Sequence, residues 1–310
     1  MRYLQPFILF STLIITHYAY SANDDGASDL GVDYAFLTLM TLSPDFAAAN
    51  YNIDNTDGTN VDIAIVRLPY HIKLMKKKFS QLELELALAH HRTEEIINTF
   101  PADDEYIDAD WNTTGLSMGL LYESDVTANL TFISSVRIGT AQMNSDATYN
   151  GPLTNLIKNS YDGTLLNWKT NSALLNLGLG LRYKWRLLDR SSNVSTNFYH
   201  IQVDSFNESN NAVHFSEAAN MFTINADMIF PTELHIGNQR VDFVFLLGNV
   251  TFMGENRDTL GYTSSYQAGL GAEIPFRWGK EKAGHIRLSS QLLWADNMDG
   301  WLLTIGYNAN

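Results

Sequence analysis

The chain has 310 residues, of which 34 are acidic and 20 are basic, and it contains no cysteine. The acidic excess argues against nucleic-acid binding, which requires a basic surface. The lack of cysteine excludes disulfides as a source of stability for an exported chain. Charged or strongly polar residues interrupt every apolar stretch, so no helical membrane span is predicted.

The first residues have the pattern of a secretory signal peptide. Arg2 is followed by an apolar run over residues 7–15 and by small residues at 19–22 that suit cleavage. The run is too short for a spanning helix, which needs about 20 apolar residues. We expect a signal peptide over residues 1–22, a short periplasmic segment over 23–33, and one outer-membrane β-barrel over 34–310.

Apolar and polar residues alternate along most of the remaining chain, which is typical of β-strands. In the segment 82–89 four leucines share one face, whereas Glu83 and Glu85 share the other face with two alanines. In the segment 175–185 large residues alternate in the same way with Asn, Gly, Arg and Lys. A helix would scatter the large residues around its circumference, whereas a strand places them on one side.

The composition of the polar faces favours a membrane barrel over a soluble sandwich. These faces are rich in Gly, Ser, Asn and Thr with isolated charges, as expected for the crowded interior of a transmembrane barrel. Aromatic residues gather at predicted strand ends, as they do in interfacial girdles. We therefore predict an all-β protein, a closed antiparallel transmembrane β-barrel in the outer membrane of a Gram-negative cell envelope. The predicted girdle consists of Tyr122, Tyr183, Trp185, Tyr262, Phe276, Trp294, Trp301 and Tyr307.

About twelve strands are predicted, and most suit a tilted strand of about 9–11 residues across a bilayer. The links after the first, third, fifth and seventh strands are long, whereas most of the others are short. Outer-membrane barrels place short turns on the periplasmic side, so both termini are expected in the periplasm. The predicted strands lie near residues 34–42, 61–72, 79–90, 114–124, 126–140, 172–186, 196–206, 220–230, 239–252, 261–276, 285–295 and 301–308.

Residues 92–113 are predicted to form an acidic extracellular loop, in which Arg92 is the only basic residue. The basic residues gather in the short turns instead, as in Lys76-Lys77-Lys78. An acidic outer surface could bind divalent cations that bridge lipopolysaccharide, and the alternative is a merely solvated loop. The expected partners are therefore outer-membrane lipid and lipopolysaccharide, with divalent cations at the acidic extracellular loops.

The C-terminal residues resemble the terminal strand signal by which barrel-assembly machinery recognises its clients. Apolar residues follow Gly300 at every second position, although three further residues follow Tyr307 where a terminal Phe normally stands. This machinery is therefore a further expected partner. The predicted signal consists of Gly300, Leu303, Ile305 and Tyr307.

A barrel of about twelve strands that ends in such a signal resembles the β-domain of autotransporters. Only a short polar segment separates the predicted signal peptide from the first predicted strand. The chain is thus most similar to the solitary autotransporter-like outer-membrane β-domain, a barrel without a passenger. The resemblance implies no catalytic residues, and no cofactor is expected.

Charged residues on the polar strand faces are predicted to line the lumen. Because both signs of charge occur, we expect internal ion pairs and a narrow or partly blocked lumen, and hence a structural role or a small pore. A porin or channel for small solutes is the alternative, because twelve strands lie between filled eight-stranded barrels and open sixteen-stranded porins. The predicted lumen-lining residues are Glu83, Glu85, Glu123, Arg137, Arg182, Lys184, Asp227, Glu273 and Arg287.

His214 and Ser216 are the strongest enzymatic candidates. Outer-membrane phospholipases and lipid A deacylases similarly place His and Ser two residues apart on one strand, where an imidazole can activate a hydroxyl. A third group that would orient His214 is not identifiable, and residues 204–220 read as a loop. A lipid-modifying hydrolase is therefore a second alternative, and catalysis is not predicted. No histidine spacing suggests a metal site.

Overall fold

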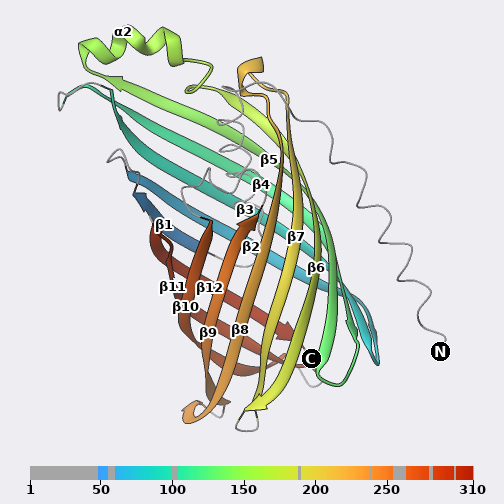
Figure 1. Cartoon of the computed structure of the whole chain (residues 1–310). Coiled ribbons are helices and arrows are strands. Elements are labelled where there is room, and N and C mark those ends of the chain that lie inside the picture. Colours follow the sequence, from blue (N-terminus) through green and yellow to red (C-terminus); the bar gives the residue numbers. More distant parts are fainter. Residues whose placement is uncertain are drawn as a thin grey trace.

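The chain forms a closed antiparallel barrel of twelve strands (Figure 1). The computed structural model describes residues 48–54, 60–99, 104–187, 190–237, 239–253, 263–278, 282–296 and 298–309. The strands are β1 (Ala48–Asp54), β2 (Asn60–Lys77), β3 (Ser80–Asn98), β4 (Tyr106–Asp125), β5 (Leu130–Asn150), β6 (Lys169–Leu187), β7 (Arg190–Phe206), β8 (Ser216–Ile236), β9 (Gln239–Met253), β10 (Ser264–Trp278), β11 (Lys282–Trp294) and β12 (Met298–Ala309).

Each strand pairs with its neighbour in the sequence, and β1 pairs with β12 to close the barrel. The closing pair runs from Ala48 opposite Leu303 to Ile53 opposite Met298. Closure satisfies the backbone groups that an open sheet would leave unpaired, which is what a bilayer demands of a spanning sheet. The predicted fold class and strand number are confirmed.

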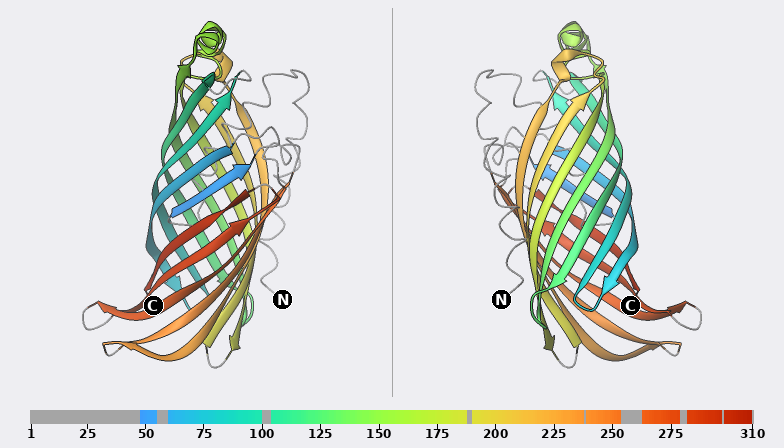
Figure 2. Two further views of the ribbon diagram at one scale, coloured as in Figure 1. Left: turned by 90° about the vertical axis from the view of Figure 1, so that its left-hand side faces the viewer. Right: turned by 90° about the vertical axis from the view of Figure 1, so that its right-hand side faces the viewer.

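The two ends of the barrel differ. One end carries helix α2 (Pro152–Tyr161) and the 3-10 helix η1 (Asn211–Val213), and we call it the α2 end. The opposite, short-turn end carries connections as brief as residues 78–79 and 126–129. The last strand, β12, finishes at the short-turn end (Figure 2). Among the described residues no helix has the length and apolar character that would let it cross a membrane.

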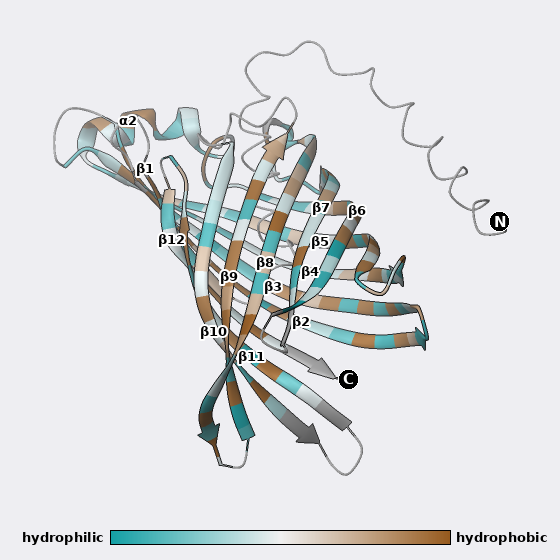
Figure 3. Cartoon of the chain, turned by 60° about the horizontal axis from the view of Figure 1, so that its bottom comes forward, coloured by the Kyte–Doolittle hydropathy of each residue, from teal (hydrophilic) through white to brown (hydrophobic). Residues whose placement is uncertain are grey.

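Side chains alternate between an exposed apolar outer surface and a buried inner surface, and hydrophilic and hydrophobic segments alternate along the strands (Figure 3). On β6 Leu175, Leu177 and Leu179 are exposed, whereas Asn176 between them is buried. An apolar side chain that faces outward in this way requires lipid rather than water around it. The alternation over 175–185 therefore has the structure that the sequence predicts.

Three predictions about the strands meet different outcomes. The predicted first strand, 34–42, lies outside the described residues. The prediction of a loop around residues 48–54 is wrong, because this Asn-containing segment is β1 and pairs on both sides. The acidic loop over 92–113 is also wrong, because β3 continues to Asn98 and β4 begins at Tyr106. The outward-facing side chains near these strand ends are polar, so the apolar–polar alternation that indicates a strand is missing there.

Four of the eight predicted girdle residues have exposed side chains on the outer surface. Tyr122, Tyr183, Trp294 and Trp301 are exposed, and the rings of Tyr183 and Trp185 stack with centroids 6.4 Å apart. Tyr262 lies outside the described residues, and Phe276 and Tyr307 lie in β10 and β12. Tyr266, which the girdle prediction omitted, stacks on Trp294 at 6.2 Å.

Candidate functional site

The inner surface holds a buried cluster of three charged residues on β2, β3 and β5. Glu85 on β3 divides its carboxylate between two guanidinium groups: Arg67 on β2 donates to Oε1, and Arg137 on β5 donates to Oε2 at 2.6 Å. All three side chains are almost completely buried. Two charge-assisted hydrogen bonds therefore join strands that are not all neighbours.

Gly119 explains how Arg137 reaches Glu85 across the intervening strand. It lies on β4 directly between Glu85 and Arg137, and a Cβ atom added there would lie 3.2 Å from the Cβ of Arg137. A glycine at this point leaves room for the arginine side chain to cross the strand. The lack of a side chain at position 119 therefore allows Arg137 to reach Glu85 and form the ion pair.

A second inner cluster joins β3, β4 and β6. Arg182 donates to Glu123 at 2.9 Å, and the side-chain amide of Gln81 donates to the same carboxylate at 2.8 Å. Glu123 is buried, whereas the side chain of Arg182 is 28% exposed. The exposed fraction indicates that water reaches this part of the interior.

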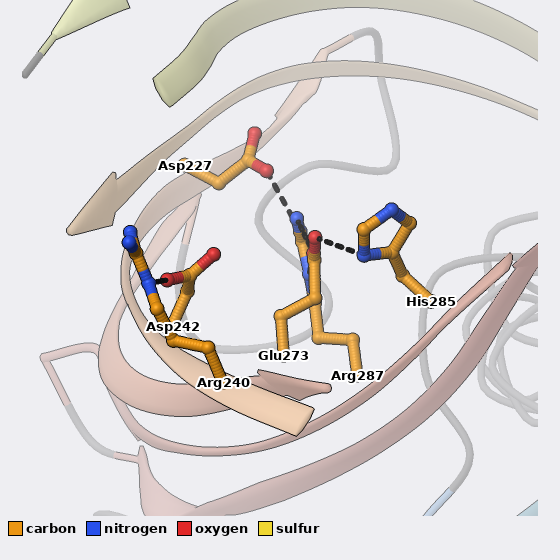
Figure 4. A network of polar contacts seen from close by, with 6 residues as sticks. All are labelled: Asp227, Arg240, Asp242, Glu273, His285 and Arg287. Carbon is orange, nitrogen blue, oxygen red and sulfur yellow. Dashed lines mark hydrogen bonds and ion pairs between the residues drawn. The ribbon is translucent and has the colours of Figure 1, made fainter. Parts of the chain in front are cut away.

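The third inner cluster occupies β8 to β11 on the other side of the barrel (Figure 4). Arg287 donates to Asp227 at 2.7 Å and to Glu273 at 2.8 Å, and so links β11 to both β8 and β10. His285 lies 3.3 Å from Glu273. A separate pair on β9 places the Arg240 guanidinium 3.1 Å from Asp242.

The structure thus brings together seven of the nine residues predicted to line the lumen. Glu85 lies with Arg137, Glu123 with Arg182, and the remaining three share one cluster: Asp227, Glu273 and Arg287. Glu83 lies 3.9 Å from His71, and Lys184 is half-buried on the inner face of β6. Two arginines share Glu85, whereas two carboxylates share Arg287, so the clusters together do not present a single sign of charge.

Sequence reasoning missed several members of these clusters. Arg67 alternates with Val66 and Leu68, so its period-two position was a usable signal for the inner face. His285 and Arg240 lie near predicted strand ends, where the inner and outer faces are hard to assign from sequence alone. The additional members are Arg67, His71, Gln81, Arg240 and His285.

Toward the α2 end the interior changes from charged to apolar. Ala141 and Met143 follow Arg137 along β5 in this direction, and both are buried. They belong to what we call the inner apolar cluster, whose buried members lie on β1, β2, β5 to β9 and β12 and in two connections. Its buried members are Ala49, Tyr51, Ile53, Ile63, Ile65, Ala141, Met143, Trp168, Leu174, Tyr199, Ile201, Val203, Val213, Phe215, Met221, Phe252, Met298 and Leu302.

Three members of the inner apolar cluster come from connections rather than from strands. Trp168 precedes β6, Val213 ends η1, and Phe215 precedes β8, yet each is no more than 3% exposed. The connections at the α2 end therefore turn inward and pack in the mouth of the barrel. Such packing fills the space that an open channel would need.

The two residues of the catalytic hypothesis, His214 and Ser216, have different hydrogen-bond partners. His214 lies before β8 and contacts Glu208 at 2.8 Å and the Ser205 hydroxyl at 3.2 Å, both through Nδ1. Ser216, the first residue of β8, donates to Asp204 at 2.5 Å. Nucleophilic catalysis needs a hydroxyl hydrogen-bonded to its base, and these two residues bond to other partners.

The Glu208 carboxylate is part of this connection at the α2 end. Hydrogen bonds from His214 and from the Ser205 hydroxyl hold the pKa of Glu208 below its usual range, against the smaller opposing effect of burial. The Ser205 hydroxyl also accepts the backbone N–H of Phe215 at 2.8 Å. These contacts fold the connection inward and place Phe215 in the inner apolar cluster, which is a structural role.

The acidic extensions do not assemble a metal-binding group. Within the described ranges no set of three or more His, Asp or Glu residues is arranged to hold a metal ion. The Arg92 guanidinium instead contacts Asp110 at 2.5 Å and Glu94 at 2.6 Å on the outer face of β3 and β4. Charge on this face is therefore partly balanced by an arginine.

The fold is a twelve-stranded closed barrel, and its class follows from the family that the sequence matches. Residues 45–280 match the model of the solitary outer membrane autotransporter beta-barrel domain, and the chain belongs to that family. A comparison with curated proteins finds no match.

Solved structures share the fold at low sequence identity. The translocator domain of the autotransporter NalP from Neisseria meningitidis aligns with a TM-score of 0.58 and 12% identity, over 90% of this chain and 94% of that one. The beta domain of the Bordetella autotransporter BrkA gives 0.52 and 11%, over 84% and 95%. The transport unit of AIDA-I from Escherichia coli gives 0.52 and 9%, over 91% and 99%.

Proposed function

We propose that the protein is a filled outer-membrane barrel that does not conduct small solutes. In this role it anchors the strand ends and connections at its α2 end. In this proposal the α2 end is extracellular, and both termini lie in the periplasm. The orientation rests on the brief connections of the opposite end, because outer-membrane barrels turn on the periplasmic side.

The observation that carries the proposal is the inner apolar cluster. A solute channel needs a continuous polar path, whereas the mouth at the α2 end is occupied by buried apolar side chains that include Trp168 and Phe215. The charged clusters below it contain both signs of charge and, taken together, have no excess of one sign that would select an ion. A porin would instead need a continuous polar path through the mouth and a lining with an excess of one sign of charge.

The proposal is tested by conductance in planar bilayers after refolding of the mature barrel. We expect no stepwise conductance from the wild type, and a leak from the variant Trp168→Ala/Phe215→Ala, which removes two of the inward side chains. Heat-modifiable gel mobility establishes that both proteins have folded. Uniform conductance steps from the folded wild type would overturn the proposal in favour of a porin.

A further inference from the structure

Arg137 on β5 leaves most of its hydrogen-bond donors unused. Its Nη2 atom donates to Glu85 at 2.6 Å, whereas its Nε and Nη1 atoms are buried and have no hydrogen-bond partner in the part of the chain that the structure describes. The side chain is only 6% exposed, so bulk water does not cover these atoms. A guanidinium group has five N–H donors, and donors that stay unpaired in a buried site are costly in free energy.

Arg287, in the cluster of β8 to β11, is an inner arginine with all of its nitrogen atoms paired (Figure 4). Its Nε and Nη2 atoms donate to Glu273 at 3.0 and 2.8 Å, and its Nη1 atom donates to Asp227 at 2.7 Å. The guanidinium group thus has two carboxylate acceptors, although its side chain is 27% exposed. Arg137 is more deeply buried and contacts one carboxylate, so it has the capacity to bind a further acceptor.

Glu85 cannot neutralise Arg137 in full, because its single negative charge is shared with Arg67. A buried charge that is only partly compensated is unfavourable, since the protein interior solvates it much less well than water does. A bound water molecule would supply a hydrogen-bond acceptor without any charge. An anion would supply both the acceptor and the negative charge.

The inner positions around Arg137 are small or neutral. Gly119 on β4 and Asn176 on β6 lie directly opposite it. Along β5 its neighbours on the same face, two residues away on each side, are Ser135 and Gly139. These neighbours supply no charge of their own, and their size favours a small ligand.

Asn176 provides a second polar group at the same level of the barrel. Its side chain is buried, and its Oδ1 atom has no hydrogen-bond partner within the described ranges, although Arg137 lies on the next strand. Rotation of an amide group exchanges its oxygen and nitrogen atoms, and the two orientations are distinguished only by the hydrogen bonds around them. Asn176 can therefore direct an N–H toward an anion that Arg137 holds.

We propose that Arg137 and Asn176 bind a halide ion, chloride in ordinary salt solutions, inside the barrel. A single-atom ion with one negative charge suits the small neighbours and the charge that Glu85 leaves uncompensated. The inner apolar cluster lies on the α2 side of the site, so the ion enters from the other side, where Arg182 is 28% exposed. This inference goes beyond the proposed function, because the ion is a retained ligand that stabilises the interior of a non-conducting barrel.

The test measures how chloride changes the stability of the refolded barrel in a zwitterionic detergent. Urea unfolding is followed by gel mobility in sodium gluconate, which is replaced stepwise by sodium chloride at constant ionic strength. A ligand that binds only the folded state raises the ratio of folded to unfolded protein about elevenfold at ten times its Kd. We expect a saturable increase of this kind in the wild type, and we expect bromide to substitute for chloride because it has the same charge and a similar size.

Arg137→Met removes the proposed anchor and leaves Arg67 and Glu85 as a one-to-one pair. The variant should fold, as judged by heat-modifiable mobility, and its stability should no longer depend on chloride. Arg186→Met is the matched control, because it removes an exposed arginine near the short-turn end of β6. The control should keep the full dependence on chloride.

Equal stability of the wild type in chloride and in gluconate would overturn the halide site, and this comparison needs no variant. The same chloride dependence in the wild type and in Arg137→Met would also overturn it, because the effect would then arise elsewhere. If Arg137→Met does not fold, Asn176→Ala takes its place and should weaken the affinity for chloride about tenfold through the loss of a hydrogen bond to a charged ligand. An unchanged affinity in Asn176→Ala would contradict the proposed pair of ligands.

Discussion

Glu105 caps the N-terminus of α2 by accepting two hydrogen bonds from Thr154. The backbone N–H of Thr154 donates at 2.6 Å and its hydroxyl at 2.7 Å, and the N–H of Leu153 donates to the other oxygen at 3.0 Å. The helix thereby receives from the β3–β4 connection the anionic cap that its own N-cap residue, Gly151, cannot supply. One carboxylate joins two connections at the α2 end.

Substitution of Glu105→Gln should loosen α2 without unfolding the barrel. The amide retains the shape of the side chain but loses the charge that the helix N-terminus favours. We expect faster hydrogen exchange at the amides of Leu153 and Thr154, measured by mass spectrometry in detergent. Asp104→Asn, an adjacent exposed acid, is the control and should leave both rates unchanged. Unchanged exchange in Glu105→Gln would contradict this role of the cap.

The same cap should respond to acid. Burial by itself raises the pKa of Glu105, but the hydrogen bonds from Leu153 and Thr154 outweigh it and hold the pKa below its usual range. A carboxylate whose folded pKa is lowered stabilises the fold above its unfolded value, near pH 4.5, and loses that effect as pH falls through the folded value. Exchange at Leu153 should therefore accelerate only below about pH 4.5, and acceleration near neutrality would contradict the assignment.

Removal of the Glu85 carboxylate should destabilise the barrel strongly. In Glu85→Ala two buried guanidinium groups lose a shared partner, and breaking a buried ion pair from one side costs about 3–5 kcal/mol. The measurement is the free energy of unfolding in urea, followed by gel mobility. Glu233→Ala is the matched control on an exposed acid and should change stability little. A loss below about 1 kcal/mol in Glu85→Ala would show that this cluster is not important for stability.

Gly178 should tolerate no side chain. It faces the interior of β6 directly opposite Tyr199, and an added Cβ would overlap the Ser135 hydroxyl and lie 2.8 Å from the Tyr199 ring. We expect Gly178→Ala to cost about 1–3 kcal/mol through overpacking. Gly306→Ala is the control, since its Cβ would lie 4.0 Å from the nearest described atom, on Arg287. Equal stability of the two variants, measured in the same urea titration, would contradict the packing described.

The sequence was sufficient to predict strand type and face, because period-two alternation follows from strand geometry wherever one face meets lipid. It was not sufficient to predict strand length. Residues such as Glu94 and Asp108 lie on strands beyond the apolar surface, where both faces can be polar and the alternation disappears. The short strand β1 was missed for the same reason, since Asn50 and Asn52 resemble loop residues.

The interior was predictable in its charged half and not in its apolar half. Glu123 and Arg182 alternate with large outer residues, so their inner position follows from parity. Phe215 and Trp168 lie in connections, which have no period, and only tertiary packing reveals that they turn inward. The pairing of Arg287 with Asp227 likewise spans strands that are not neighbours and has no local signal.

Closure between β1 and β12 can be fixed by a designed disulfide. Asn52 and Asp299 are direct partners in the register, and the chain has no cysteine that could compete. We expect Asn52→Cys/Asp299→Cys to oxidise readily to an intramolecular bond, because cross-strand partners come within disulfide range. Non-reducing electrophoresis of the unfolded protein should show a faster, reductant-sensitive band. A pair displaced in register, Asn52→Cys/Leu303→Cys, should remain reduced, and its oxidation would contradict the register.

The filled lumen is tested most directly by thiol accessibility in reconstituted vesicles. Asn176→Cys places a single thiol on the inner face of β6, where the native side chain is buried at the level of Arg137. Lys184→Cys, near the short-turn end, and Thr148→Cys, at an exposed position of β5 near the α2 end, are the accessible controls. A membrane-impermeant maleimide should label both controls and leave Asn176→Cys unmodified from either side. Rapid labelling of Asn176→Cys in the folded barrel would show a water-filled channel and contradict the filled lumen.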